Sequence, residues 1–172
     1  MRPQGVSSSV RGIDRDLVDH VWRDVTAYPP ARVASEAAEF IARQPHVAVL
    51  TRAMTEGQDP AVGQAAFGLA FLLVKIVEES LGHAFPPIAE ARIAEACEAT
   101  RQWLAGDAAA DPAGMLERAA DPAHPSLVPY VLSVFYGEAD GVPRSEYDEG
   151  VRACLALLLR TLSTALDLGA VE

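Results

Sequence analysis

Paired glutamates are the first candidates in this chain for chemical function, because their spacing could bring two carboxylates to one site. Glu36 and Glu39, and likewise Glu95 and Glu98, are three residues apart, which places two carboxylates on one helix face. A di-iron bundle needs a histidine three residues after a glutamate, projecting inward from facing helices. No histidine follows a glutamate at that spacing. We therefore expect these carboxylates to lie on solvated helix faces.

Histidines are the next candidates, as metal ligands. The chain has four of them, His20, His46, His83 and His124. Zinc sites on helices use H-x-x-x-H or H-E-x-x-H spacing, and neither occurs here. Three of the four histidines stand close to a proline, where a helix starts or ends. We expect these side chains to cap helix ends locally or to face solvent.

Nucleophile and phosphate-binding motifs are missing as well. There is no G-x-S-x-G turn, and the glycines of residues 106–114 do not follow a phosphate-loop pattern. The acidic loop at 137–150 does not fit the calcium-binding frame of an EF-hand. Cys97 and Cys154 lie in apolar helical patterns without C-x-x-C spacing, which predicts buried, reduced thiols. The sequence thus predicts no catalytic residue, metal or cofactor.

Charge and composition narrow the class of partner. The formal net charge is −10, so a polyanion such as nucleic acid or an anionic membrane surface would be repelled. The 13 arginines against one lysine suggest GC-rich coding and hence a bacterial source. Residues 1–12 are polar and lack the apolar core of a signal peptide. We expect a cytoplasmic protein with a frayed tail over residues 1–12.

The elements that must position these residues are all predicted to be helices. Apolar residues recur at three- and four-residue spacing, and no segment alternates as a half-buried strand would. Pro45 divides two helices, Asp59 is a predicted N-cap, and Gly82 is a predicted stop. The pattern predicts a compact all-α bundle of seven or eight helices, at about 13–27, 31–43, 45–55, 60–81, 88–105, 112–120, 126–136 and 145–168.

A faint internal repeat runs through this helix order. Trp22 and Trp103, the two tryptophans, are 81 positions apart, each late in an amphipathic helix. Residues 44–57 resemble 124–137 at an offset of 80, and residues 68–77 resemble 154–163 at an offset of 86. We interpret residues 13–172 as one domain with two pseudo-repeated four-helix halves, 13–82 and 88–169. The halves would pack about a pseudo-twofold axis or stack as two helical repeats.

The most apolar stretch, residues 65–79, raises the question of a membrane anchor. Its uncharged run covers 10 residues, Ala65–Val74, whereas a spanning helix needs about 20. Positions 64, 68, 71, 75 and 78 form one thin, mostly polar stripe, on which Phe71 is the large apolar member. We therefore predict a core helix that touches solvent along this stripe, with Lys75 paired to Glu79 one turn on.

Three functional interpretations remain open. The first is a non-enzymatic interaction or scaffold domain that binds another protein or a second copy of itself. Its candidate contact residues are Phe71, Lys75, Tyr130 and Tyr136. We expect Tyr130 and Tyr136 to be partly exposed, near an inward-facing Phe135. The second is a small-molecule sensor with an apolar pocket between the central helices, which a cavity of about 300 Å³ or more would favour. The third is an enzyme assembled from scattered His and Glu.

Overall fold

The computed structural model describes residues 13–106, 127–136 and 148–166. Within these ranges it contains seven helices and no strand, which confirms the all-α prediction. The expected helix at 112–120 and the expected tail at 1–12 fall outside the described residues. The helices are α1 (Arg15–Thr26), α2 (Pro30–Arg43), α3 (Pro45–Met54), α4 (Pro60–Leu81), α5 (Glu90–Ala105), α7 (Leu127–Tyr136) and α8 (Glu149–Ala165).

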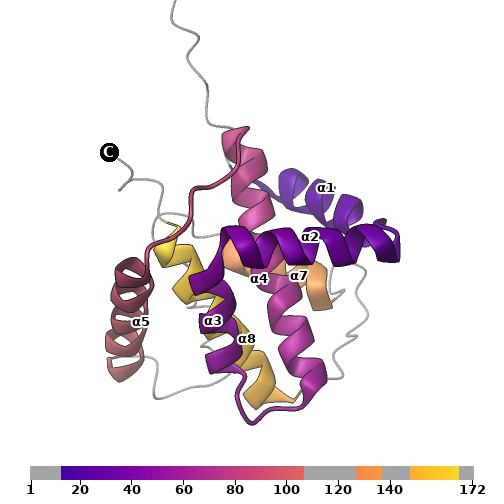
Figure 1. The fold of residues 1–172 in the computed structure, drawn as a ribbon. Coiled ribbons are helices and arrows are strands. Elements are labelled where there is room, and N and C mark those ends of the chain that lie inside the picture. Colours follow the sequence, from indigo (N-terminus) through magenta and orange to yellow (C-terminus); the bar gives the residue numbers. More distant parts are fainter. Residues whose placement is uncertain (1–12, 107–126, 137–147, 167–172) are drawn as a thin grey trace, which may run out of the picture.

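Helices α4 and α8 form the centre of the molecule. They contact each other, and α1 and α3 pack on α4 while α5 and α7 pack on α8 (Figure 1). Eleven of the 22 residues of α4 are buried, since neighbours cover most of its circumference. This central position is the reason why α4 is apolar on nearly every side.

Most helix ends follow the residues that predicted them. The side chains of Asp14 and Asp59 accept hydrogen bonds from Leu17 N and Ala61 N, at 2.9 and 2.8 Å, and so cap α1 and α4. Gly82 ends α4 in the left-handed conformation, at a φ of 74°, which a glycine adopts without steric cost. The predicted N-cap and stop of α4 are therefore confirmed.

Three helices start later than predicted. α1 begins at Arg15 rather than Ile13, because Asp14 is extended and caps the helix. α5 begins at Glu90 rather than Ile88, because Ile88 N donates to the buried Gln44 side chain and Ala89 is extended. α8 begins at Glu149 rather than Ser145, because Asp148 is extended and its side chain accepts from Val151 N at 2.8 Å. The carboxylate of Asp148 is thus the N-cap itself, and not part of the first helical turn.

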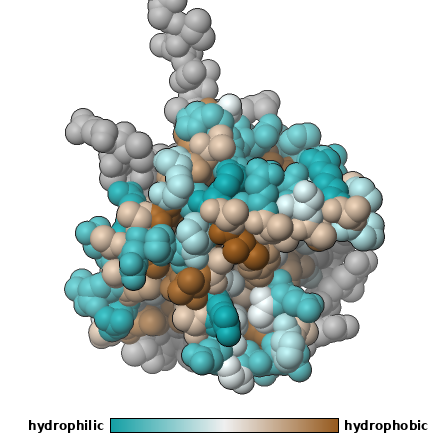
Figure 2. Space-filling view, viewed as in Figure 1, coloured by the Kyte–Doolittle hydropathy of each residue, from teal (hydrophilic) through white to brown (hydrophobic). Residues whose placement is uncertain are grey.

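Helix α2 is attached to the molecule by few residues. It lies across α4 on the outside of the bundle (Figure 1), and Phe40 is the one buried residue among its 14. The exposed large hydrophobic side chains of the described residues are Val33 and Ile41 on α2 and Val49 on α3. Figure 2 shows apolar atoms reaching the surface where α2 and α3 meet.

The junction of α2 and α3 is held by one buried amide. Gln44 is 1% exposed, and its Nε2 donates to the carbonyl oxygens of Phe85 and Pro86, at 3.2 and 3.0 Å. Its Oε1 accepts from Ile88 N at 3.0 Å. The side chain therefore satisfies three backbone groups of the segment between α4 and α5, and ties that segment to the α2–α3 junction.

Helix α4 as a whole is long and apolar enough to cross a membrane, by length and composition alone. The prediction that the apolar stretch is too short to span is therefore wrong, because it counted Ala65–Val74 alone and not the 22 residues of the helix. Of its most apolar 18-residue window, 56% is buried inside the structure, as in the core helix of a folded bundle. This burial supports the interpretation of α4 as a central helix.

Candidate functional site

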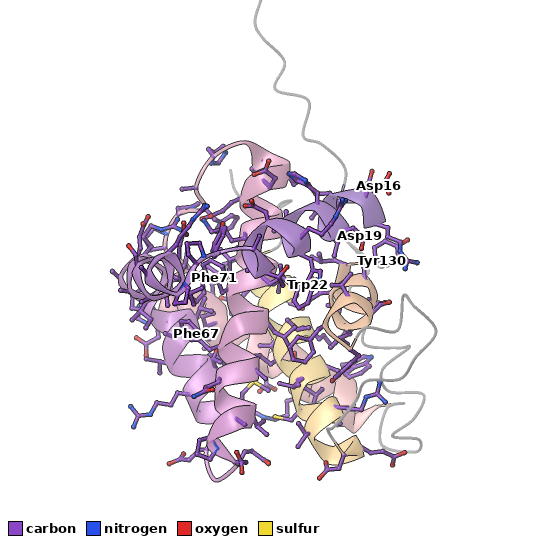
Figure 3. All side chains as sticks on the ribbon, turned by 90° about the vertical axis from the view of Figure 1, so that its right-hand side faces the viewer. Asp16, Asp19, Trp22, Phe67, Phe71 and Tyr130 are labelled. Carbon is purple, nitrogen blue, oxygen red and sulfur yellow. The ribbon has the colours of Figure 1, made fainter. Side chains whose placement is uncertain are left out.

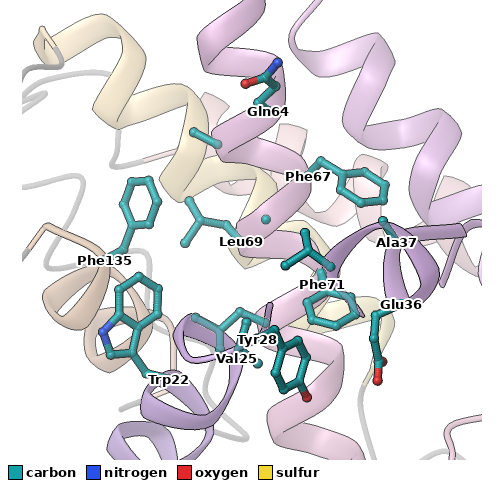
Figure 4. A pocket seen from close by; sticks show the side chains of 14 residues that line it. Trp22, Val25, Tyr28, Glu36, Ala37, Gln64, Phe67, Leu69, Phe71 and Phe135 are labelled. Atoms are coloured by element: carbon teal, nitrogen blue, oxygen red, sulfur yellow. The ribbon is translucent and has the colours of Figure 1, made fainter. Parts of the chain in front are cut away.

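An open cavity of about 330 Å³ lies between α1, α2, α4 and α7 (Figure 4). Five aromatic side chains line it, together with aliphatic residues, and we term it the aromatic cleft. Apart from the polar atoms of the aromatic residues, the lining offers two polar side chains, Glu36 and Gln64. The five aromatic residues are Trp22, Tyr28, Phe67, Phe71 and Phe135.

Three helices supply four of the aromatic rings, and Tyr28 comes from the linker between α1 and α2. Phe67 and Phe71 are one turn apart on α4, so both point to the same side of that helix. Trp22 on α1 meets Phe135 on α7 edge to face, with ring centroids 6.4 Å apart, at the opposite side of the cleft (Figure 4). The distance between these positions in the sequence explains why no local pattern predicted the cleft.

Gly68 keeps part of the cleft free. It lines the cleft in the middle of α4, and a Cβ atom built on it would meet no atom within 4 Å. Its φ is not positive, so neither backbone conformation nor close packing requires a glycine there. A glycine inside a helix costs about 0.5–1 kcal/mol relative to alanine. Its visible effect is the space that a side chain would fill.

Helix α2 forms the outer wall. Val33, Glu36 and Ala37 face the cleft from this helix. Phe40, one turn further on, inserts between Phe67 and Phe71, with centroid distances of 5.4 and 5.5 Å and nearly perpendicular rings. The wall is thus fastened by an edge-to-face aromatic cluster in which Phe40 contacts two lining residues, Phe67 and Phe71.

Ion pairs fasten α2 on both sides of Phe40. Lys75 Nζ lies 3.0 Å from Glu36 Oε2, and Arg43 Nη1 lies 2.7 Å from Glu78 Oε1. The hydrogen bond from Lys75 holds the pKa of the Glu36 carboxyl below its ordinary value. The hydrogen bond to Glu78 raises the pKa of Arg43, and Glu78 also accepts from Phe85 N at 3.0 Å.

Two cationic side chains of the protein lie against aromatic rings at the end of the cleft where Glu36 stands, which we term the Glu36 end. Lys75 Nζ is 5.5 Å from the centroid of the Phe71 ring, and the Arg32 guanidinium carbon is 3.7 Å from that of Tyr28. Arg32 Nε also lies 3.5 Å from Glu36 Oε1. Burial, with the nearby Asp24, raises the pKa of the Tyr28 hydroxyl.

No protein-family model matches this chain, and neither a curated protein nor a solved structure is similar to it. A functional proposal for this chain therefore rests on the geometry of the cleft. Its lining can enclose an apolar molecule and offers it one carboxylate and one amide. Apolar walls with a few polar groups are typical of sites for small molecules.

Two of the four predicted contact residues meet at this cleft. Phe71 lines it, and Lys75 lies beside Phe71 and pairs with Glu36. The predicted pairing of Lys75 with Glu79 is wrong, because α2 crosses α4 and brings Glu36 closer to the ammonium group. Phe71 was predicted to lie on the solvent-exposed stripe of α4. This prediction is wrong, because Phe40 covers Phe71 and leaves it 8% exposed.

The two tyrosines of α7 lie elsewhere. Tyr130 is half-buried and stands on the side of α7 next to α1, well apart from Phe67 and Phe71 (Figure 3). The expected exposure of Tyr136 is wrong, since it is 3% exposed, with the Arg152 guanidinium 4.4 Å from its ring centroid. α7 contacts α1, α4 and α8, so little of its surface faces solvent. Phe135, expected to point inward, is half-buried and lines the cleft.

The two cysteines do not line the cleft. Cys97 and Cys154 are half-buried free thiols, and burial raises the pKa of both. In the described part of the chain, no group of three or more His, Cys, Asp and Glu side chains could hold a metal ion.

Sequence reasoning missed Trp22, Phe67, Phe135 and Gly68 as site residues. The one local signal was Gly68 on the polar stripe of an otherwise bulky helix.

Proposed function

We propose that this protein binds a small, largely apolar molecule in the aromatic cleft and acts as a ligand sensor. The cleft carries the proposal: about 330 Å³ between four helices, lined by five aromatic side chains, with Gly68 leaving its floor open. Pockets for small molecules have this size and this mixture of apolar walls and few polar groups. Helix α2 is suited to report occupancy, because it walls the cleft and has one buried residue.

Replacing Gly68 by leucine is expected to abolish ligand binding without unfolding the protein. The new side chain would project into the cleft, where no atom opposes its Cβ. The measurement is the fluorescence of an uncharged apolar probe, N-phenyl-1-naphthylamine, titrated with protein. We expect saturable binding to the wild type and at least about tenfold weaker binding to Gly68→Leu, since the cleft volume is filled.

Gly63→Leu is the matched control. It places the same side chain on the same helix but outside the lining of the cleft, where a Cβ would lie 3.7 Å from Thr55 Oγ1 in a neighbouring hollow between α3 and α4 that shares Gln64 and Phe67 with the cleft. Wild-type affinity is expected for this variant. Equal probe binding by Gly68→Leu and the wild type would contradict the proposal, as would no binding by the wild type.

A second candidate function is self-association through α2 and α3. What supports it is the exposure of Ile41 and Val49, at 48% and 67%, on two helices that contact each other and outside the lining of the cleft. Exposed apolar side chains that gather on one face mark interaction surfaces. Sedimentation equilibrium tests this: we expect a dimer that Val49→Lys dissociates and that Ala91→Lys, at an exposed position of α5, leaves intact. A wild-type monomer at 100 μM, roughly the concentration of a weak association, would exclude it.

We also propose that the chain consists of two related halves, residues 13–82 and 88–169. The supporting observation is a matched set of contacts: α1 packs on α4 as α5 packs on α8, and α3 packs on α4 as α7 packs on α8. Across the halves, α1 contacts α7 as α5 contacts α3. An experimental structure covering residues 107–126 tests this, because a helix packed on α7 as α2 packs on α3 is expected there.

A further inference from the structure

The charged groups at the end of the aromatic cleft where Glu36 stands indicate which kind of ligand it binds. Glu36 is the one ionised side chain in the lining, and its lowered pKa keeps it charged. The adjoining polar hollow shares Val25 and Tyr28 with the cleft and contains two more carboxylates, Asp24 and Glu79. Arg32 and Lys75 are the basic groups there, beside His20. Three carboxylates thus face two permanent cations at this end.

The protein's own cations show what this end recognises. Lys75 lies against both the Phe71 ring and the Glu36 carboxylate, and Arg32 lies against both the Tyr28 ring and the same carboxylate. Aromatic faces carry negative partial charge and attract cations, most strongly where water is excluded. Each cation is therefore held by a ring and an anion together.

We propose that the ligand of the aromatic cleft is an organic cation with an aromatic or aliphatic body, whose charged group lies at the Glu36 end in competition with Lys75. This inference rests on the proposed function of the cleft. The five aromatic rings accommodate the body, and Glu36 with the Phe71 and Tyr28 rings receives the charge. An anionic ligand would meet Glu36 and an overall charge of −10, which repels it at long range and attracts cations.

The test compares molecules of one shape and different charge. Benzyltrimethylammonium and neopentylbenzene are isosteres that differ by one positive charge, and phenylmethanesulfonate is an anionic counterpart. Displacement of N-phenyl-1-naphthylamine gives their affinities for the wild type. We expect the cation to bind about tenfold more tightly than the uncharged isostere, because it gains the ring and carboxylate contacts. The anion is expected to bind most weakly.

Two variants move the cation's affinity in opposite directions. Glu36→Gln removes the carboxylate and should weaken binding of benzyltrimethylammonium about tenfold. Lys75→Met removes the competing ammonium and should strengthen it. Glu39→Gln is the matched control, since Glu39 is on the same helix, does not line the cleft, and its side chain is 64% exposed. The readout is the ratio of the affinities for benzyltrimethylammonium and neopentylbenzene, because a change in the shape of the cleft affects both ligands and a loss of the charge contact affects the cation alone.

The outcomes separate this inference from the proposed function. If the naphthylamine probe does not bind the wild type, the cleft is no binding site and both proposals fail. If the probe binds but the cation and its isostere displace it equally, or Glu36→Gln leaves the cation's affinity unchanged, the cationic ligand alone is overturned. A preference for phenylmethanesulfonate would also overturn it.

Discussion

Replacing Phe40 by alanine is expected to lower the free energy of unfolding by about 3–5 kcal/mol, the range for removing a fully buried aromatic side chain. Phe40 is 1% exposed and packs edge to face on both Phe67 and Phe71. It is also the one buried residue of α2, so its loss removes the apolar contact that holds the wall of the aromatic cleft. Urea denaturation followed by circular dichroism measures the effect.

Ile41→Ala is the control for this variant. Ile41 is the next residue on the same helix and is 48% exposed, so its truncation is expected to cost less than about 1 kcal/mol. Phe40→Ala should in addition weaken binding of N-phenyl-1-naphthylamine, measured well below the denaturation midpoint. A Phe40→Ala protein as stable as Ile41→Ala would show that α2 is not held in place by this contact.

Gln44→Leu is expected to destabilise the protein by about 2–4 kcal/mol, although leucine is apolar and of similar size. The substitution leaves Ile88 N and the carbonyl oxygens of Phe85 and Pro86 without the partner they have now. A buried polar group that loses its partner costs about 1–3 kcal/mol, and water can reach the half-buried Pro86 carbonyl. Urea denaturation again gives the value.

Gln58→Leu serves as the comparison. Gln58 is exposed in the turn before α4, and the same change there should alter the free energy of unfolding by no more than about 0.5 kcal/mol. If Gln44→Leu were as stable as this control, the three hydrogen bonds of Gln44 would contribute nothing beyond what an apolar side chain supplies.

The helices and several of their ends were predictable because local physics sets them. Pro45 cannot continue α2, the Asp59 carboxylate caps α4, and Gly82 adopts the left-handed conformation that ends it. Ile88 and Ser145 misled the prediction of helix starts. Ile88 is engaged by Gln44, 44 residues earlier in the chain, and Asp148 rather than Ser145 caps α8.

The site residues were predicted less well, because burial on a helix depends on what crosses it. The stripe of α4 that includes Phe71 and Lys75 was expected to face water, whereas α2 crosses it and contributes Phe40 and Glu36. Tyr136 was expected near the surface, yet α7 is enclosed by α1, α4 and α8. Neither crossing leaves a periodic signal in the sequence of the helix that is covered.

By itself, the sequence determined that the chain is helical, where most of its helices begin and end, and that α4 is a central element. These properties follow from residue spacing and capping, which act within a few turns of one helix. Only the tertiary structure decided that a cleft exists, because Trp22, Phe71 and Phe135 meet only when three helices pack. It also decided that Gly68 opens this cleft and that Glu36 and Lys75 meet at its charged end, since contacts between separate helices depend on how those helices cross.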